Sequence, residues 1–528
     1  MIMIIYLLGA VVALLLAQYL IQTFRFRRYG VKYFAPIPLL GNSARTLFRL
    51  KSIGEQIQEM YNTFSDERFY GKFEVTSTMV EVRDLELVKK IAVKDFEHFL
   101  DHRQIFGKFD SAVARSLIAL TGQDWKDMRS TLSPAFTSSK IRLMVPFMKE
   151  VGDQMVLALK KRMKDSKTGK VDVNCKDLTA RYANDVIATC AFGLKVDSHN
   201  DTSNEFYSYG KLVTGVSFRD TVILLLSYSF PIITKIFTLD LKQPENFFSD
   251  IFSYTLRDRK AKSVIRPDLI HLLLEANKGK LTHEDIKSDE KTGFATVEES
   301  SVGRKQSNKV WPEKDLIAQA LLFFIAAFET ISNGMTYLMY EMARNPDIQE
   351  RVVQEIKETD EKHGGQLDFN AIQNMEYLDM VISEVLRMWP PVVNLDRICN
   401  KKYNMGKPNA KAKNDFIIQE GTGVSIPVYA FHRDPSYYPN PEKFDPERFS
   451  NENKHKIPSF AYLPFGVGPR NCIGSRFALC EMKIMAYQIL QHFAIFPSSK
   501  TVIPPVLATD SLNLKIKGGD WLALECRQ

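Results

Sequence analysis

The sequence predicts a mainly α-helical body with small β-sheets, preceded by an N-terminal transmembrane anchor. Three observations support this fold class: apolar residues recur at helical spacing over long segments, strand-like segments are short, and the chain begins with an uncharged apolar run. The helical segments are Met144–Lys164, Leu178–Phe192, Leu316–Met342, Asp347–His363 and Tyr377–Met388. The strand-like segments are Glu74–Val82, Ile417–Ile418, Gly423–Pro427 and Asn513–Ile516.

The N-terminal run Met1–Ile21 is long enough to span a membrane, because a helix of about twenty apolar residues crosses a hydrocarbon core of ~30 Å. A cleaved signal peptide would have a basic start and a shorter apolar core. The basic residues that follow the run are Arg25, Arg27, Arg28 and Lys32. Because positive charge stays on the cytosolic side, we expect residues 1–24 to be an anchor whose N-terminus faces the lumen. A buried core helix is the alternative.

The rest of the chain divides into a connector and one large body. Residues 25–42 are basic and contain Pro36 and Pro38, so we expect a short, stiff connector. Residues 43–528 show no inter-domain seam and no internal repeat, and we treat them as a single domain. Within this domain, the polar stretch at about 287–310 is expected to be an exposed insertion.

A second apolar stretch, Thr221–Leu239, is interrupted by Pro231 and Lys235. These interruptions favour two short helices over a second membrane span. An apolar face on such helices could enter the membrane surface, or the helices could belong to the core. The sequence leaves both interpretations open.

The composition excludes several classes of protein without selecting a function. The chain has 528 residues, 45% of them apolar and 25% charged, which is typical of a globular protein. Its formal net charge of +8 is too mild to indicate nucleic-acid binding, and we expect none. The six cysteines include no C-x-x-C pair, so we expect reduced thiols rather than a disulfide framework or a zinc ribbon.

The most informative segment is Pro464–Leu490, in which a glycine-rich loop presents one cysteine before a helix. Gly466, Gly468 and Pro469 prevent regular structure before Cys472, and helical periodicity resumes at Ser475. Backbone N–H groups at a helix N-terminus stabilise a thiolate. Two side chains complete the loop: Phe465 could shield the sulfur, and Arg470 could pair with an acidic group of a cofactor. A structural or redox-sensing cysteine is the alternative.

The pattern F-x-x-G-x-R-x-C-x-G, from Phe465 to Gly474, resembles the haem-binding signature of the cytochrome P-450 superfamily. The resemblance implies the cytochrome P-450 fold, a single large catalytic domain, and a haem whose axial ligand is the Cys472 thiolate. It also implies that Phe465, Arg470 and Gly474 contact the cofactor. Cys480 lies eight residues later without a comparable loop, and we expect it to be structural.

Two further motifs match the family in the expected order. Glu384 and Arg387, in SEVLRMWPP, share one helix face, and Arg448 follows in FDPERF. The resemblance implies that these three residues form a buried Glu–Arg–Arg cluster that stabilises the fold around the haem. Buried charges require such mutual pairing.

The segment Phe323–Asn333 resembles the oxygen-activation helix of the family. The resemblance implies that Ala326 leaves room over the iron, that the Thr330 hydroxyl binds dioxygen or relays a proton, and that Glu329 is a proton source. One residue departs from the pattern, because Ala327 stands where the family usually has glycine. The extra methyl group is expected to narrow the groove that admits water and oxygen.

The resemblance also implies partners for the haem propionates and a substrate pocket. The spacing of Trp125 and Arg129 places both on one helix face, and bidentate pairing of arginine with carboxylate is strong. The predicted propionate partners are Trp125, Arg129, Arg397, Arg470 and, more weakly, Arg103. His432 and Arg433 resemble a family element near the same haem edge. The predicted pocket residues are Leu322, Phe323, Ala326, Val392, Val393, Leu395 and Leu512.

The implied activity is insertion of one oxygen atom from O2 into lipophilic small molecules. Because the chain has no Rossmann or flavin fingerprint, electrons must come from a separate donor, expected to be NADPH–cytochrome P-450 reductase and also cytochrome b5. The expected location is the endoplasmic reticulum membrane with the catalytic domain in the cytosol. An acidic donor could dock on basic residues, for which we predict Lys126, Arg129, Lys140, Arg142 and Lys483.

The segment TLSPAFTSSKIR and the polar insertion favour an insect-type, microsomal, xenobiotic-metabolising member of the superfamily. Three alternatives remain open. The enzyme could act on an endogenous hormone or lipid, it could be a non-oxidative haem-thiolate isomerase or dehydratase, or the chain could be a haem-binding sensor without catalytic activity. The Glu329–Thr330 pair argues against the isomerase.

Overall fold

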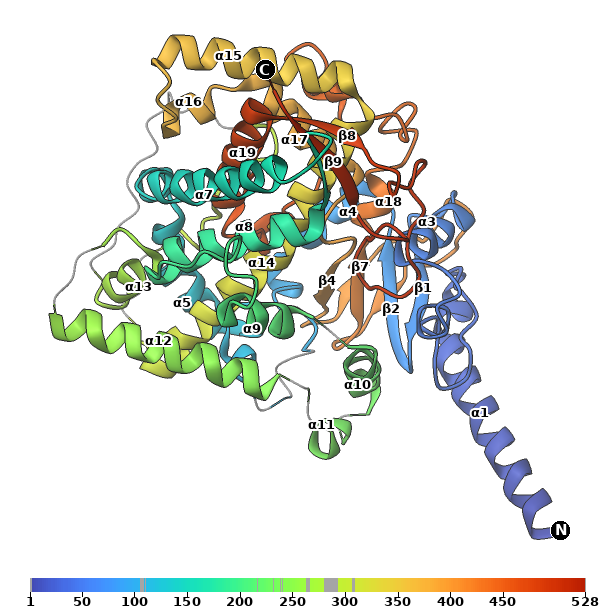
Figure 1. Ribbon diagram of the computed structural model, residues 1–528. Coiled ribbons are helices and arrows are strands. Elements are labelled where there is room, and N and C mark those ends of the chain that lie inside the picture. Colours follow the sequence, from blue (N-terminus) through green and yellow to red (C-terminus); the bar gives the residue numbers. More distant parts are fainter. Residues whose placement is uncertain are drawn as a thin grey trace.

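The computed structural model describes residues 2–104, 109, 111–215, 217–230, 232–237, 239, 241–262, 266–279, 293–305 and 309–527. Helices form most of the body, three small sheets lie at its periphery, and α1 projects away from it (Figure 1). The predicted mainly helical fold class is therefore confirmed. The first half of the chain forms the helices α1 (Ile2–Tyr29), α2 (Ala44–Leu47), α3 (Ile53–Thr63), α4 (Leu85–Lys89), α5 (Gly122–Leu132), α6 (Ser138–Arg142), α7 (Val145–Lys164), α8 (Cys175–Phe192), α9 (Glu205–Thr214), α10 (Phe218–Ser229), α11 (Ile233–Ile236), α12 (Lys242–Lys262) and α13 (Leu269–Asn277).

The second half contains the longest helix and the helix that follows the loop carrying Cys472, residues 464–474, here called the cysteine loop. It forms α14 (Glu313–Arg344), α15 (Pro346–His363), α16 (Phe369–Gln373), α17 (Glu376–Met388), α18 (Val428–Phe431) and α19 (Ser475–His492). Short 3-10 or π turns are η1 (Lys90–Lys94), η2 (Phe96–His98), η3 (Ala112–Arg115), η4 (Ser133–Phe136), η5 (Pro446–Phe449), η6 (Lys454–Lys456) and η7 (Gly468–Arg470). The five helical segments that periodicity predicts correspond to α7, α8, α14, α15 and α17.

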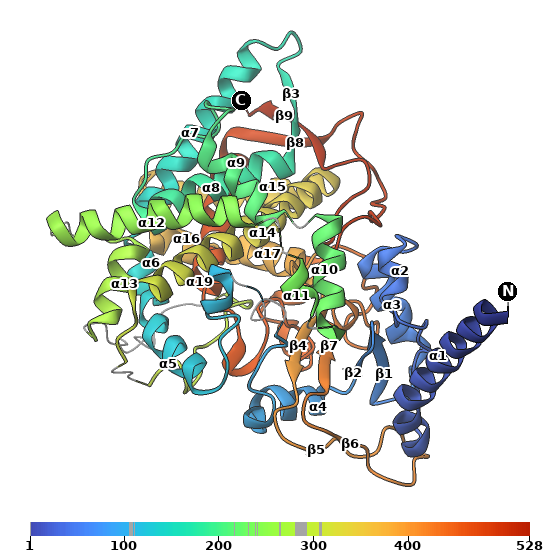
Figure 2. The same cartoon turned by 90° about the horizontal axis from the view of Figure 1, so that it is seen from below.

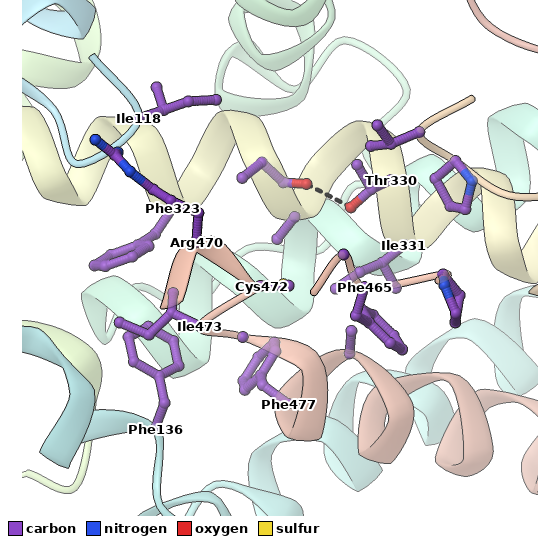
Figure 3. A pocket seen from close by; sticks show the side chains of 18 of the residues that line it. Ile118, Phe136, Phe323, Thr330, Ile331, Phe465, Arg470, Cys472, Ile473 and Phe477 are labelled. Carbon is purple, nitrogen blue, oxygen red and sulfur yellow. Dashed lines mark hydrogen bonds between the residues drawn. The ribbon is translucent and has the colours of Figure 1, made fainter. Parts of the chain in front are cut away.

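Helix α14 runs through the centre of the body and packs against α8, α12, α17 and α19 (Figure 1). Helix α14 is long and apolar enough to cross a membrane, but half of its most apolar window is buried inside the fold. Neighbouring helices therefore cover a large part of this apolar surface, as expected of a core helix. Its middle turns, around Thr330, lie opposite the loop that precedes α19 (Figure 3).

The three sheets are small and lie outside the helical core. The largest has the strand order β1–β2–β7–β4, in which β7 is parallel to β2, and the other sheets have the orders β3–β9–β8 and β5–β6. The strands are β1 (Phe69–Glu74), β2 (Ser77–Val82), β3 (Lys170–Asn174), β4 (Leu395–Ile398), β5 (Tyr403–Asn404), β6 (Ile417–Ile418), β7 (Gly423–Ile426), β8 (Phe493–Pro497) and β9 (Trp521–Cys526).

Most predictions for the smaller elements are confirmed: Glu74–Val82 contains β2, and Ile417–Ile418 and Gly423–Pro427 correspond to β6 and β7. The expected strand Asn513–Ile516 is wrong, because only Ile516 forms an isolated bridge, to Leu507. The apolar stretch Thr221–Leu239 does form two short helices, α10 and α11, as predicted. Pro231, to which we attribute the interruption, lies outside the described residues.

The polar insertion differs from the exposed segment expected from its composition. Its described part includes residues 293–305, which contain neither helix nor strand but lie against the body. Ala295 and Val302 are buried in the main core, and the ring of Phe294 packs on Phe449 and Tyr462. A few apolar side chains in a polar stretch are thus enough to attach it. Residues 287–292 and 306–308 of the predicted insertion lie outside the described residues.

Candidate active site

A cavity of about 500 Å³ lies between α14 and the loop that precedes α19 (Figure 3). The segment after α17 and residues 102–104 complete its wall, which is mostly apolar. Of the site residues predicted from the sequence, this wall contains Arg103, Phe323, Ala326, Thr330, Val392, Leu395, Phe465, Arg470, Cys472 and Gly474. Segments far apart in the sequence therefore meet around one hollow.

The loop before α19 directs Cys472 into the cavity. Gly466 and Gly468 have φ values of +75° and +73°, which favour glycine, and a Cβ at Gly468 would lie 1.8 Å from the Ala92 carbonyl oxygen. The Cys472 N–H donates to the Phe465 carbonyl at 2.8 Å, which closes the turn. Burial raises the pKa of the Cys472 thiol, although the backbone N–H of Gly474 favours the thiolate. A nearby metal cation would supply the remaining stabilisation of the thiolate.

Thr330 lies across the cavity from Cys472 (Figure 3). Its hydroxyl donates to the Ala326 carbonyl, one turn earlier in α14, at 2.5 Å. A hydroxyl that donates in this way still has lone pairs with which to accept a hydrogen bond. Ala326 and Ala327 both line the cavity beside it, and α14 continues through them without interruption.

Glu329 faces away from the cavity wall. Its carboxylate pairs with the Lys176 ammonium at 3.1 Å and accepts from the Asn333 amide at 3.3 Å. Lys176 also donates to the Ser332 hydroxyl at 2.6 Å. The acid next to Thr330 is therefore held on another side of α14, in a partly exposed charged cluster.

Three largely buried guanidinium groups, those of Arg103, Arg397 and Arg470, gather at one end of the cavity, where Arg470 pairs with Asp101 at 3.3 Å. Burial and the neighbouring Arg397 lower the pKa of Arg470 to about 9, and burial also lowers the pKa of Arg397. Arg470 donates to the Leu100 carbonyl at 2.8 Å, whereas Arg397 donates to the Asp396 carbonyl at 2.7 Å and does not itself line the cavity. Arg103, which lines the cavity, pairs with Glu74 at 2.7 Å.

Trp125 and Arg129, both on α5, lie behind this end of the cavity rather than in its wall. The Arg470 guanidinium stacks on the Trp125 ring, 4.0 Å from its centroid. Arg129 contacts Glu299 through two hydrogen bonds of 3.1 and 2.7 Å and donates to the Asn471 carbonyl at 2.7 Å. The structure thus brings Arg129 to the outer side of the cysteine loop, next to the polar insertion.

The predicted pocket residues do not all reach the cavity. Leu322 and Val393 do not line it and pack against the main hydrophobic core, and Leu512 is exposed. The periodicity of a helix gives a residue's face only approximately, and a loop has no periodicity at all. This explains why neighbours of true lining residues were included in the prediction.

Glu384, Arg387 and Arg448 form a buried charge cluster next to the cysteine loop. The Arg387 guanidinium donates to the two Glu384 oxygens at 2.7 and 2.9 Å, and Arg448 approaches Glu384 to 3.4 Å. Glu384 also accepts from the Asp445 N–H at 2.8 Å. His432 connects this cluster to the cysteine loop, because its ring nitrogens contact the Arg387 carbonyl at 3.0 Å and the Leu463 N–H at 2.9 Å. Burial and Arg387 lower the His432 pKa to about 3, so the ring is neutral.

Comparison with known proteins agrees with this geometry. A family model described as Cytochrome P450 matches residues 32–523. This chain belongs to the cytochrome P450 family. Cytochrome P450 9e2 of Blattella germanica is 41% identical over 535 residues, covering 98% of this chain and 97% of that protein. Probable cytochrome P450 9f2 of Drosophila melanogaster is 37% identical and covers 94% of each chain, and cytochrome P450 6j1 of Blattella germanica is 35% identical, covering 96% of this chain and 94% of that protein.

Membership of the cytochrome P450 family makes the protein a haem-thiolate monooxygenase, and the insect relatives agree with the insect-type prediction. The cavity fits a haem on three counts. It has an apolar interior, it has a thiol in its wall, and it has largely buried guanidinium groups at one end, of which Arg103 and Arg470 line the wall. The two carboxylates of a bound haem would find hydrogen-bond donors in these guanidinium groups.

Sequence reasoning missed several residues of this cytochrome P450 site. His102 lines the cavity with its Nδ1 atom 3.0 Å from Asp396, which also accepts from the Arg103 N–H at 2.7 Å. The side chains of Phe136 and Phe477 lie near Cys472 (Figure 3). His102 stands next to the predicted Arg103, and because alternation along an extended segment would place adjacent side chains on opposite faces, no pattern in the sequence identified it.

Proposed function

We propose that Cys472 supplies the axial thiolate of the haem and that Thr330 controls protons on the opposite side of the same cavity. The observation that carries this proposal is their position, across one mostly apolar hollow of about 500 Å³. A bound haem supplies the activation of O2, and the thiolate ligand favours O–O cleavage. The protein supplies the ligand, the orientation and the exclusion of water. Product formation that depends on O2 and NADPH, in the presence of a reductase, tests the proposal.

Besides Cys472, two groups of side chains hold the cofactor in this proposal. Arg470, together with Arg103 and Arg397, supplies positive charge for the propionates, and Trp125 orients Arg470 through the stacking contact. Phe465 and Gly474 border the sulfur, with the Gly474 N–H aimed at it. Arg129, held by Glu299 and Asn471, would reach a propionate only by leaving these partners.

Proton movement uses residues on two sides of α14. We propose that Glu329, partly exposed beside Lys176, collects protons and that the Thr330 oxygen transfers them within the cavity. Changing Thr330 to alanine is expected to reduce product formed per NADPH consumed by at least about tenfold and to increase peroxide. Measurement of NADPH, peroxide and product in one assay checks this. Thr330→Ser keeps the hydroxyl and should stay coupled, and tight coupling in the alanine variant would contradict a proton role.

For the substrate, we propose lipophilic xenobiotics such as plant toxins or insecticides. The support is the apolar wall on the α14 side of the cavity, where Ile118, Phe323 and Val392 present no polar group. Such a wall selects by size and hydrophobicity rather than by a fixed set of hydrogen bonds. A screen of chemically diverse compounds by haem difference spectroscopy tests this. Binding of one endogenous lipid or hormone class to the exclusion of all others would instead favour the alternative role.

Family membership implies a redox partner, and we propose NADPH–cytochrome P-450 reductase, with cytochrome b5 as a second donor. The basic docking patch predicted from the sequence needs revision. Arg129 and Lys483 are buried, paired with Glu299 and Asp379 respectively, and Lys126 pairs with Glu97 at 2.7 Å. In this arrangement Arg129 and Lys483 are covered, so an acidic donor reaches either of them only when Glu299 or Asp379 moves away.

We also propose that residues 1–24 anchor the enzyme in the endoplasmic reticulum membrane and that residues 25–42 connect the anchor to the cytosolic domain. Supporting this, Tyr6, Leu14 and Ile21 of α1 are 75%, 71% and 74% exposed. Helix α11 and the N-terminal end of α1 project from the same side of the molecule (Figure 1). Figure 2, the view from below, has α10 and α11 on the near face, and Ile232 and Ile236 there are exposed. This arrangement favours the membrane-surface interpretation of Thr221–Leu239.

Removal of residues 1–24 is expected to weaken vesicle binding without abolishing it, because the apolar side chains near α11 remain. Adding Ile232→Asp and Ile236→Asp to that variant should release the protein into the soluble fraction. Flotation with phosphatidylcholine vesicles measures both effects. Complete release by the truncation alone would exclude α11 from membrane contact, and full retention of the combined variant would contradict the proposed membrane contacts.

A further inference from the structure

The described insertion residues 293–305, here called the strap, lie behind Cys472 as seen from the cavity. Asn471, the residue before Cys472, donates from its side-chain amide to the Glu298 carbonyl at 2.8 Å. Neither Asn471 nor any strap residue lines the cavity, so the strap covers the outer side of the cysteine loop. Glu299 is close enough to Cys472 to influence its pKa.

The outer side of the cysteine loop is the face where an electron would enter. The rate of electron transfer falls steeply with the distance between donor and acceptor. On the opposite side of the cavity, α14 and the substrate space separate the thiolate from the protein surface. A donor that docks on the outer side reaches the thiolate through the loop itself. In this protein the strap occupies part of that face.

Glu299 contacts the docking face in the way that an acidic partner would. Its carboxylate and the Arg129 guanidinium form two parallel hydrogen bonds, and their side chains are 20% and 3% exposed. Such bidentate pairs are strong and directional. An acidic donor surface seeks the same guanidinium, so donor and strap compete for Arg129.

Beyond the Glu299 contact, the strap is held by a few hydrogen bonds and three apolar side chains, of which Ala295 and Val302 are buried. The Phe294 N–H donates to Asp379 at 2.9 Å, the Phe294 ring packs on Tyr462, and the Ser130 hydroxyl donates to the Lys305 carbonyl. The strap has no helix or strand of its own within the described residues 293–305. Segments with few buried apolar contacts open at low free-energy cost. The strap therefore has the properties of a cover that can be displaced.

We propose that the strap is an intramolecular competitor of the electron donor, which docks by displacing Glu299 from Arg129. This inference rests on the proposed function, because it assumes that an acidic flavoprotein reductase delivers electrons to the haem. When only a fraction of the molecules is in the docking-competent state, the apparent affinity for the donor is the intrinsic affinity multiplied by that fraction. Variants that weaken the contacts between the strap and the body should therefore bind the donor more tightly.

The first test compares two variants that change the charge equally. Glu299→Gln removes the charge that contacts Arg129, whereas Glu298→Gln removes a neighbouring charge whose side chain is 86% exposed and lies 3.7 Å from Arg304. The Kd of the haem-loaded, full-length enzyme for NADPH–cytochrome P-450 reductase is measured in phosphatidylcholine vesicles. We expect Glu299→Gln to lower this Kd at least about fivefold more than Glu298→Gln does. Equal Kd values for the two variants would overturn the proposal.

The second test changes no charge. Phe294→Ala removes the ring that packs on Phe449 and Tyr462 and should also lower the Kd for the reductase. Hydrogen–deuterium exchange of residues 293–305 in the wild-type enzyme should become faster when the reductase is added. Slower exchange would mean that the strap is part of the docked interface, and the proposal would be wrong.

A spectroscopic control separates this proposal from the proposed function. The dithionite-reduced, carbon-monoxide-bound spectrum needs no protein donor, and wild type and all three variants should give the same thiolate band. Loss of that band in the wild type would remove the basis of the proposed function. An intact band with an unchanged Kd in the Glu299 and Phe294 variants would overturn the strap proposal alone.

Discussion

Replacement of Cys472 by histidine is expected to lower monooxygenase turnover by at least about two orders of magnitude, because the thiolate push on the haem is lost. An imidazole at this position can still face the cavity, since the loop that directs residue 472 is built by Gly466 and Gly468. The variant should bind haem with a carbon-monoxide spectrum typical of histidine ligation. Turnover with reductase and the absorption spectrum measure the two effects separately.

A second cysteine in the cavity wall provides the matched control. Cys190, on α8, also lines the cavity, and burial raises its pKa well above the usual range. Cys190→Ala should therefore retain both the thiolate spectrum and turnover. If Cys190→Ala lost the thiolate band and Cys472→His kept it, Cys190 would be the ligand and the assignment of Cys472 would be wrong.

Glu384→Gln is expected to cost about 3–5 kcal/mol of native stability, the usual result of removing one partner from a buried ion pair. Glu384 and Arg387 are completely buried, and Arg448 depends on the same carboxylate. The amide cannot balance two guanidinium groups. Because His432 links Arg387 to the cysteine loop, the variant should also lose haem. The urea midpoint and the yield of haem-loaded protein measure the loss.

A surface pair shows what an ordinary charge change does. Glu150 pairs with Lys195 at 3.1 Å, and both side chains are largely exposed. Glu150→Gln should change the stability by less than about 1 kcal/mol, as is usual for exposed pairs. Equal urea midpoints for the Glu384 and Glu150 variants would show that the buried cluster does not stabilise the fold.

Local patterns predicted those parts of the fold that are set by neighbouring residues. Helix α14 follows from helical periodicity, and the turn before Cys472 follows from its glycines. The strand-like patterns located β2, β6 and β7, whereas β3, β8 and β9 were missed because these strands gain their stability from pairing with distant segments. Asn513–Ile516 shows the opposite error, since a strand-like sequence remains irregular when it finds no partner along its length.

In the candidate site, too, sequence motifs predicted some features and could not predict contacts between distant residues. Motif positions predicted that Cys472, Thr330 and Arg470 meet at one cavity. They could not predict that Glu329 would be held by Lys176, or Arg129 by Glu299, because both partners lie far away in the sequence. The polar composition of the strap likewise gave no indication that it packs on the body, since its apolar contacts come from Phe294, Ala295 and Val302 alone among residues 293–305.

The reduced, carbon-monoxide-bound difference spectrum of the wild-type protein tests the central claim most directly, namely that Cys472 is the axial ligand of a haem in this cavity. A thiolate-ligated haem is predicted to give a Soret band strongly shifted to the red of that of a histidine-ligated haem. Absence of this band from folded, haem-loaded protein would contradict the assignment of Cys472.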